Sequence, residues 1–353
     1  MAQTAAQQAL DSLRVKYHLP AMLAAVIQPQ RICYVYGGVR RSDQTTQITL
    51  TDYFHFGSDT KGVTSLLAGK LVEQGKIRWE SKLLDVVPSL RTTALPAYAD
   101  VTLAALLSHR AGIPPYDSGA KIRRLPAFSG TVRQKRQQFA AFVLQQPPVL
   151  PGPGEVYAYS NAGYALAALM LEQVSQRSWE ELVARAFHKL KLHYVVGFPN
   201  RGDAQQPWGH WRQAATDSVL TPLGPLHPYH LQDFLAPAGD LAMPLPDYAR
   251  LIQKHLRGLL GHANYLKAKT YQLLHFGKPS YAYGWGVLKL PATGAPVSFH
   301  NGTAGTFYCH TILYPSQQVA LIVLTNAGGE AAEAACYALH RRLKQLYLQG
   351  QLE

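Results

Sequence analysis

Strand-like segments lie towards both ends of this 353-residue chain, and helical segments fill most of the middle. Apolar and β-branched runs bounded by turn residues predict strands near the N-terminus at 21–27 and 32–39. The same signals recur near the C-terminus, at 281–290, 297–300, 306–314 and 319–325. Because packed layers need one shared core, we expect the first and last parts of the chain to meet in one sheet.

The middle of the chain shows the three- and four-residue apolar spacing of helices. A short strand candidate at 53–56 leads directly into one of them, which starts near Ser58 and continues through Val63, Leu66 and Leu71. Asp247 is a plausible N-cap of a later helix, and residues 198–234 read as a long surface loop. The other predicted helices are 4–17, 101–107, 132–144, 162–174, 179–190, 247–256 and 331–346.

This order predicts an α/β (α+β) fold with a discontinuous sheet domain and a mainly helical insertion. The sheet domain would comprise residues 1–61 and 246–353, and the helical domain residues 62–245. We expect the active site at the interface of the two.

Composition excludes several other classes of protein. Hydrophobic residues make up 47% of the chain and charged residues 16%, which is typical of a globular protein and not of a disordered one. No stretch reaches the roughly 18–20 apolar residues of a membrane span. Residues 1–10 lack the pattern of a signal peptide, so the protein stays in the cytoplasm or a leader has been removed, and both remain open. Cys33, Cys309 and Cys336 are too scattered for a disulfide framework and read as buried apolar residues.

The net charge of +13 raises the question of nucleic-acid binding. The basic residues are dispersed in short groups at 121–124, 133–136 and 341–344. This pattern is more typical of solvent-exposed faces than of a nucleic-acid-binding surface, and its milder functional interpretation is attraction of an anionic substrate. Among fourteen histidines, only His227 and His230, with Asp233, approach metal-ligand spacing, and Pro228 opposes the helix that would align them. We therefore expect no nucleic acid, no metal and no cofactor.

One candidate nucleophile has a useful context. Ser58 and Lys61 lie three residues apart on one helical turn, where the helix N-terminus offers free N–H groups and a positive partial charge. A serine hydroxyl needs such a neighbour to take its proton. Alone, S-x-x-K fits an N-cap serine and a surface lysine equally well. It also recurs at Ser118 and Lys121, without a strand-to-helix transition. Asp59 reads as a first-turn acid that favours the helix dipole.

Two further motifs follow along the chain. Tyr159 and Asn161 form the only Y-x-N, just before a predicted helix. A phenol beside cationic groups loses its proton more easily and can act as a base, and a carboxamide can orient a lysine. The third motif is His300-Asn301-Gly302, at the end of a predicted strand. In isolation, Y-x-N is better explained by a capping Asn and a packed Tyr. H-x-G recurs at 55–57 and 275–277 and alone is compatible with a simple β-turn.

Together, in this order and spacing, the three motifs resemble the serine β-lactamase and penicillin-binding-protein superfamily. More narrowly, they look like its class C β-lactamase-related branch, which includes family VIII carboxylesterases, D-aminopeptidases and D-Ala-D-Ala carboxypeptidases. Segments such as Phe56-Gly57-Ser58, 106–109, 236–241 and 284–286 are similar too, so the resemblance runs from about residue 19 to the final helix. It implies a β-lactamase-like fold, with an antiparallel sheet flanked by helices.

The resemblance also implies roles for individual residues. Ser58 would be acylated, with Lys61 as its proton partner and Tyr159 as the general base. Asn161 would position Lys61 and the substrate amide, and His300 would take the place that the family often fills with lysine. The backbone N–H groups of Ser58 and Thr303 would form an oxyanion hole. The remaining predicted substrate contacts of the third motif are Asn301 and Gly302. Specificity is expected around Tyr116 and in the 198–234 loop, because loops on a rigid scaffold carry binding residues.

His-Asn-Gly departs from the family's Lys-Thr-Gly, which lowers the expectation of β-lactam hydrolysis. The predicted function is hydrolysis of a small ester, amide or lactam through a Ser58 acyl-enzyme. The predicted substrates include anionic ones. The alternative is a penicillin-binding sensor or scaffold that retains the fold without turnover. The natural substrate, the preference for D or L substrates and the oligomeric state stay open.

Overall fold

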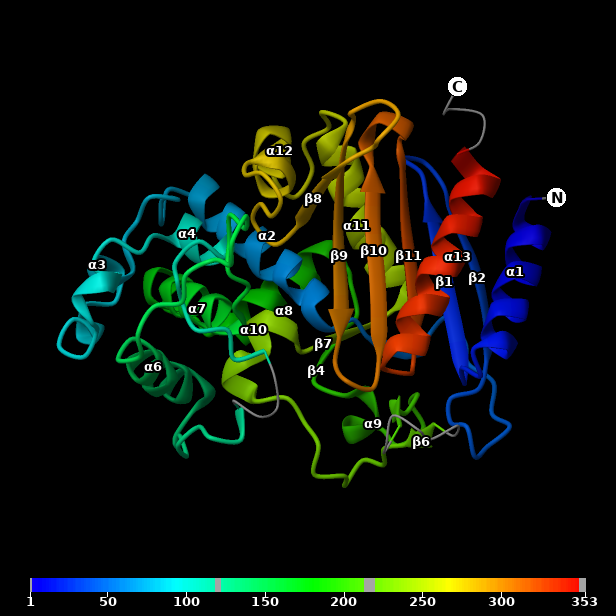
Figure 1. Cartoon of the computed structure of the whole chain (residues 1–353), viewed down its shortest axis with the longest axis horizontal. Helices are drawn as coiled ribbons and strands as arrows, with labels where there is room; N and C mark the ends of the chain where they lie inside the picture. Colours follow the sequence, from blue (N-terminus) through cyan, green and yellow to red (C-terminus); the bar gives the residue numbers. More distant parts are fainter. Residues whose placement is uncertain (1, 118–121, 213–219, 349–353) are drawn as a thin grey trace.

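The computed structural model of the chain describes residues 2–117, 122–212 and 220–348. A six-stranded antiparallel sheet forms one side of the molecule, and a group of helices lies beside it (Figure 1). The strand order is β2-β1-β11-β10-β9-β8. The strands are β1 (Ala21–Ile27), β2 (Ile32–Gly38), β8 (Gly286–Lys289), β9 (Pro296–Thr303), β10 (Tyr308–Tyr314) and β11 (Val319–Thr325).

The first and last parts of the chain meet in this sheet. Strand β1 lies between β2 and β11, and Leu23 pairs with Leu324 in the antiparallel register. The backbone N–H of Ala21 donates to Asn326 Oδ1 at 2.9 Å, across 305 residues of sequence. The predicted α/β class and antiparallel sheet are therefore confirmed.

Helices cover both faces of the sheet, which explains why its central strands are apolar throughout. Helices α1 (Ala2–Lys16) and α13 (Glu330–Leu348) pack on one face, and α11 (Leu245–Leu259) packs on the other. Successive side chains of a strand point to opposite faces. Met22 accordingly joins the apolar cluster under α1 and α13, while Leu23 joins the larger cluster on the opposite face. Every residue of β1 and β11 is buried.

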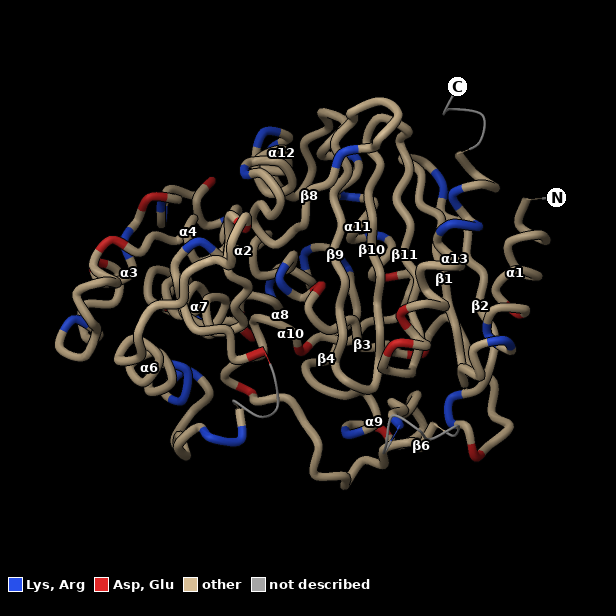
Figure 2. The backbone as a smooth tube through the Cα atoms, in the orientation of Figure 1, with Lys and Arg blue, Asp and Glu red and all other residues tan. Residues whose placement is uncertain are grey.

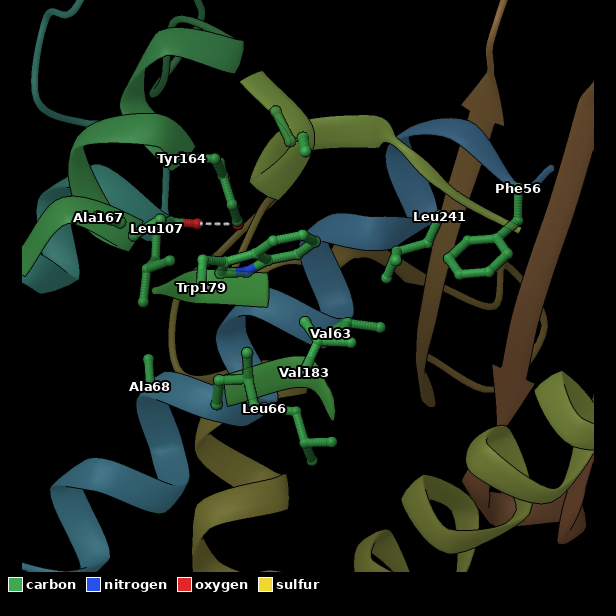
Figure 3. Close-up of a cluster of buried hydrophobic side chains, with 14 of the residues drawn as sticks. Phe56, Val63, Leu66, Ala68, Leu107, Tyr164, Ala167, Trp179, Val183 and Leu241 are labelled. Atoms are coloured by element: carbon green, nitrogen blue, oxygen red, sulfur yellow. Dashed lines mark hydrogen bonds between the residues drawn. The ribbon is translucent and has the colours of Figure 1, made fainter. Parts of the chain in front are cut away.

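Helix α2 (Thr60–Glu73) occupies the centre of the helical part and carries the lysine of the S-x-x-K motif. Figure 3 shows Val63 and Leu66 of this helix among apolar side chains that include Trp179 and Val183. Trp179 is fully buried, and its Nε1–H donates to Thr64 Oγ1 at 3.0 Å. Burial of such large side chains stabilises a fold by about 1.5–3 kcal/mol each, so α2 is firmly held below the site.

The other helices lie between α2 and α11 along the chain, except α12, which follows α11. They are α3 (Leu83–Val86), α4 (Leu103–Leu107), α6 (Val132–Val143), α7 (Asn161–Ser175), α8 (Trp179–Leu190), α9 (Pro199–Gly202), α10 (Ala236–Gly239) and α12 (Ala268–Phe276). The domain division at residues 61/62 and 245/246 stays a prediction.

Two expectations about individual elements are wrong. Helix α11 begins at Leu245 with Pro244 as its N-cap, and Asp247 lies within the first turn, where it accepts from the backbone N–H of His193. The strand expected at 281–290 is confined to Gly286–Lys289, because Gly284 adopts a left-handed φ of 86° that interrupts an extended backbone.

The structure also contains elements that the sequence did not predict. Besides α12 these are β7 (Leu241–Pro244) and β4 (Val195–Val196), which form a small sheet with β3 (Tyr53–His55), the short strand expected at 53–56. The expected loop at 198–234 contains α9 and the paired strands β5 (His210–Trp211) and β6 (Thr221–Pro222), and its residues 213–219 lie outside the described part.

Basic residues are spread over both the helical part and the sheet (Figure 2). Within the described residues, none of the helices combines the length and apolarity that a membrane crossing requires. All three cysteines are free thiols, with Cys309 and Cys336 buried and Cys33 half-buried.

Candidate active site

Ser58 lies in a single 3-10 turn, Gly57–Asp59, between β3 and α2. The preceding Gly57 has a φ of 53°, in the left-handed region that favours glycine. Its N–H donates to His55 Nδ1 at 3.0 Å, and His55 Nε2 lies 2.9 Å from Asp240 Oδ1. This strand-to-helix turn therefore presents Ser58, which keeps partial contact with solvent, at the start of α2.

Lys61 lies one turn further on and is fully buried. Its Nζ is 3.2 Å from Ser58 Oγ and 2.7 Å from both Asn161 Oδ1 and the backbone oxygen of Ala238. Asn161 and Ala238 offer acceptor oxygens at fixed positions. They can take the two hydrogens of an uncharged amine, which leaves the nitrogen lone pair directed towards Ser58.

The charge state of Lys61 follows from its surroundings. Burial lowers the pKa of the Lys61 amine well below its usual value of 10.5, because desolvation disfavours the ammonium, while the Asp59 carboxylate acts in the opposite direction. The rings of Tyr159 and Tyr164 lie 4.7 and 5.4 Å from Nζ and stabilise its charged form. Burial has the largest effect, so the uncharged base is much more accessible here than at the surface.

Tyr159 approaches Ser58 from the other side, with 2.9 Å between its hydroxyl and Ser58 Oγ. Burial raises the pKa of the Tyr159 phenol, whereas the hydrogen bond to Ser58 acts to lower it. This direction is opposite to the one expected from its cationic neighbours. The resting phenol therefore keeps its proton and donates to Ser58 Oγ.

The Y-x-N segment is held in place by the start of α7. Ser160 is the N-cap, and its side chain accepts from the N–H of Gly163. Asn161 uses Oδ1 for Lys61 and Nδ2 for the backbone oxygen of Tyr116 at 3.3 Å. Because the Tyr116 carbonyl can only accept, Nδ2 must face it, and Oδ1 is left to accept from Lys61.

The third motif lies on β9, directly against the turn that carries Ser58. A Cβ on Gly302 would come within 1.9 Å of the backbone oxygen of Phe56, and one on Gly57 within 2.5 Å of the backbone nitrogen of Thr303. Two glycines thus allow β9 to touch the turn. They bring the backbone of Thr303 against Gly57, the residue next to Ser58 in the chain.

His300 also faces this turn, whereas Asn301 does not. Nδ1 of His300 is 3.3 Å from Asp59 Oδ1. Asn301 is the next residue along β9, and its side chain bonds to Tyr337 Oη at 2.6 Å and to His310 Nδ1 at 2.6 Å, on the face covered by α13. Adjacent residues of a strand point to opposite faces. The predicted substrate contact through the Asn301 side chain is therefore not supported by the geometry.

Tyr116 contributes less than expected as well. Its ring packs edge-on against Phe139 and Phe142 of α6, and its link to the site is the backbone oxygen that holds Asn161.

Three groups at the site have no counterpart among the predicted residues. One is the Ala238 carbonyl, a backbone group in the family-like segment 236–241. His109 accepts the backbone N–H of Ser160 on Nδ1, and its ring lies 4.4 Å from that of Tyr159. Tyr281 places its hydroxyl 3.0 Å from His300 Nε2. His109 lies in the family-like segment 106–109, and this similarity was the sequence signal that could have identified it as a site residue.

The second S-x-x-K, Ser118 to Lys121, lies outside the described residues. Among the residues described, no three His, Cys, Asp or Glu side chains gather in a way that could hold a metal ion.

The family comparison agrees with this geometry. The Beta-lactamase family model matches residues 4–345. The chain belongs to this family, within the serine β-lactamase and penicillin-binding-protein superfamily.

Individual relatives are distant. Penicillin-binding protein 4 from Amycolatopsis lactamdurans is 24% identical over 348 residues, covering 91% of this chain and 84% of that protein. Protein flp from Staphylococcus aureus (strain NCTC 8325 / PS 47) is 22% identical over 345 residues, covering 92% of this chain and 64% of flp. The chain thus spans just under two thirds of flp.

A solved structure shows the shared fold. The octameric penicillin-binding protein homologue from Pyrococcus abyssi superimposes with a TM-score of 0.76 at 19% identity, covering 99% of this chain and 77% of that one.

Proposed function

We propose that the protein is a serine hydrolase that cleaves a small ester, amide or lactam through an acyl-enzyme on Ser58. The observation that carries the proposal is the position of Ser58 Oγ between two proton-transfer groups, Lys61 Nζ at 3.2 Å and Tyr159 Oη at 2.9 Å. A hydroxyl held between an amine of lowered pKa and a phenol fits nucleophilic catalysis better than a structural cap.

In the acylation step, Ser58 Oγ attacks the substrate carbonyl carbon and its proton passes to the uncharged Lys61 amine. The N–H groups of Ser58 and Thr303 bind the developing oxyanion, and each such donor contributes about 10²–10³-fold to the rate. The tetrahedral intermediate then expels the alcohol, amine or amide nitrogen, which takes a proton from the Lys61 ammonium. Tyr159 lies beside Ser58 and can relay that proton.

Deacylation repeats the sequence with water in place of Ser58. Water attacks the acyl carbon while the regenerated Lys61 amine, acting through the Tyr159 hydroxyl, accepts its proton. The intermediate releases the carboxylic acid product and returns the proton to Ser58 Oγ. In this account the base is Lys61 and the phenol is the relay. The pKa directions at the two residues support that assignment.

A substrate panel tests the proposal: p-nitrophenyl butyrate, a D-alanyl amide and nitrocefin, each assayed with the wild type and with Ser58→Ala. Turnover of at least one substrate that disappears in Ser58→Ala is expected. The rival function is a penicillin-binding sensor or scaffold, which the name of the Amycolatopsis relative keeps open. A stable acyl adduct without turnover would favour the sensor, and neither adduct nor turnover would favour the scaffold. Either result would overturn the hydrolase.

A further inference from the structure

Asp59 follows the nucleophile in the chain, and its carboxylate is completely buried. Its Oδ2 accepts from Tyr248 Oη at 2.8 Å and from Cys309 Sγ at 3.3 Å. Among the described residues its Oδ1 has no hydrogen-bond partner of good geometry, and His300 Nδ1 lies 3.3 Å from it. The side chain does not cap α2, although Asp59 is the N-cap residue. A buried carboxylate oxygen without a bonded partner needs an explanation.

The surroundings of His300 determine where its imidazole carries a proton. Nδ1 lies 3.0 Å from the backbone oxygen of Asn301 and 3.3 Å from Asp59 Oδ1, and both atoms can only accept when Asp59 is ionised. Nδ1 therefore holds a hydrogen in either charge state of the ring. Nε2 lies 3.0 Å from Tyr281 Oη, a hydroxyl that can donate to the neutral ring or accept from the charged one.

Two donors and an imidazole surround the Asp59 carboxylate. Tyr248 and Cys309 donate to Oδ2, and His300 Nδ1 lies 3.3 Å from Oδ1. Donors to a carboxylate stabilise its charged form. The Asp59–His300 pair then has a net charge of zero when the imidazole is protonated and is negative when it is neutral. In neither state does this pair present a net positive charge to a substrate.

We propose that Asp59 is a positioning residue that fixes His300 and cancels its charge, and that the site in consequence prefers acyl substrates without a free carboxylate near the reacting carbonyl. The inference rests on the proposed hydrolase function and names its substrate class. The anionic substrates that the overall charge suggests would be disfavoured by this local arrangement. Neutral esters and amides would be favoured.

The test compares two thioesters that differ in one group, S-benzoyl thioglycolate and its methyl ester, with thiol release as the readout. The wild type is expected to show a higher kcat/KM for the methyl ester by about tenfold. Asp59→Asn removes the negative charge and keeps the side-chain shape, so the preference should fall by about fivefold or more. Asp100→Asn, which changes an exposed carboxylate paired with Lys82, is the matched control and should leave the preference unchanged.

The ratio of kcat/KM for the two thioesters isolates the charge effect, because a change in the basicity of Lys61 alters both kcat/KM values together. If Asp59→Asn turns over the thioesters too slowly, the inhibition constants of phenylboronic acid and 3-carboxyphenylboronic acid are compared instead. Their ratio measures the same preference against a carboxylate without turnover. A wild type that prefers the free carboxylate, or a ratio unchanged in Asp59→Asn, would overturn the inference while leaving the hydrolase intact. Absence of Ser58-dependent turnover of both thioesters and of the substrate panel would instead overturn the proposed function.

Discussion

The amine of Lys61 lies 3.2 Å from Ser58 Oγ, while its other two oxygen neighbours, on Asn161 and Ala238, are both at 2.7 Å. The two shorter contacts hold the nitrogen, and the longer one is to the hydroxyl that loses its proton in the proposed reaction. Because burial lowers the pKa of this amine, the geometry and the charge state favour the same role for Lys61, that of the base.

Replacing Lys61 by methionine keeps a long unbranched side chain and removes the base. We expect kcat/KM to fall by about 10³-fold, within the range that general-base groups contribute. In the wild type, kcat/KM should rise with pH as the ammonium loses its proton, at a pH well below 10.5. This rise should be missing from the residual activity of Lys61→Met. A rise that persists in the variant would assign the titration to another group.

The same substitution makes a prediction about stability. The pKa of Lys61 is lower in the folded protein than the 10.5 of the unfolded chain, so the unfolded state binds more protons between those two values. The free energy of unfolding of the wild type should therefore increase with pH through that window. Lys61→Met should be more stable than the wild type at low pH, and the gain should shrink as the pH approaches 10.5. Urea unfolding of both proteins across pH measures this difference, and a gain independent of pH would contradict it.

Tyr159→Phe removes one hydroxyl that contacts Ser58 Oγ. We expect kcat to fall by about 10²-fold, with little change in the melting temperature, since a proton relay is lost and the ring remains. Tyr157→Phe is the control, because Tyr157 is a neighbouring half-buried tyrosine whose ring packs near His109 and Tyr281. Its effect should stay below about threefold. Equal losses in the two variants would argue for a packing role of Tyr159.

Gly302→Ala tests the contact between β9 and the nucleophile turn. The new Cβ would meet the backbone oxygen of Phe56 at 1.9 Å, so the strand must shift and the Thr303 N–H must leave its place. We expect a loss of about 1–3 kcal/mol in unfolding free energy and of about 10²-fold in kcat. Gly202→Ala, at a position with open space around it, should change neither quantity. Wild-type activity in Gly302→Ala would refute the placement of the oxyanion hole.

A buried ion pair in the helical part offers a test of what stabilises the fold. Arg136 and Glu172 contact each other with both side chains fully buried. Burial raises the pKa of Glu172 despite the opposing influence of Arg136. Arg136→Met should destabilise the protein by about 3–5 kcal/mol because it removes the cation that contacts the buried Glu172 carboxylate and the half-buried Glu180. Adding Glu172→Gln should recover most of that loss, measured by urea unfolding. No recovery in the double variant would mean that lost packing dominates.

The first and last residues of some elements can be predicted from the sequence, because local residue patterns determine them. Strands β1 and β11 are continuous apolar runs between turns, since both of their faces are buried. Helix α8 is bounded by the Ser178–Glu181 capping box and a left-handed Lys191. Helix α12 and strand β7 escape prediction, because short segments without clear periodicity depend on tertiary contacts.

At the candidate site the sequence indicates which residue types are present, and the fold decides which way they point. The spacing of Ser58 and Lys61 on one helical turn is a local property, so it could be predicted. Whether Asn301 or His300 faces the site depends on the pairing register of β9, and a one-residue shift exchanges them. Asp59 reads as a helix-dipole residue in the sequence, and only the packing of β9, β10 and α11 around the turn reveals its contact with His300.

The most direct test of the account is the site of covalent labelling. The intact protein would be incubated with a fluorophosphonate, and the mass and position of the adduct determined by mass spectrometry for the wild type, Ser58→Ala and Ser118→Ala, the last altering the serine of the second S-x-x-K. A single adduct on Ser58 is predicted in the wild type and in Ser118→Ala, with none in Ser58→Ala. An adduct that persists in Ser58→Ala, or a wild type that is never labelled, would contradict the claim that Ser58 is the nucleophile.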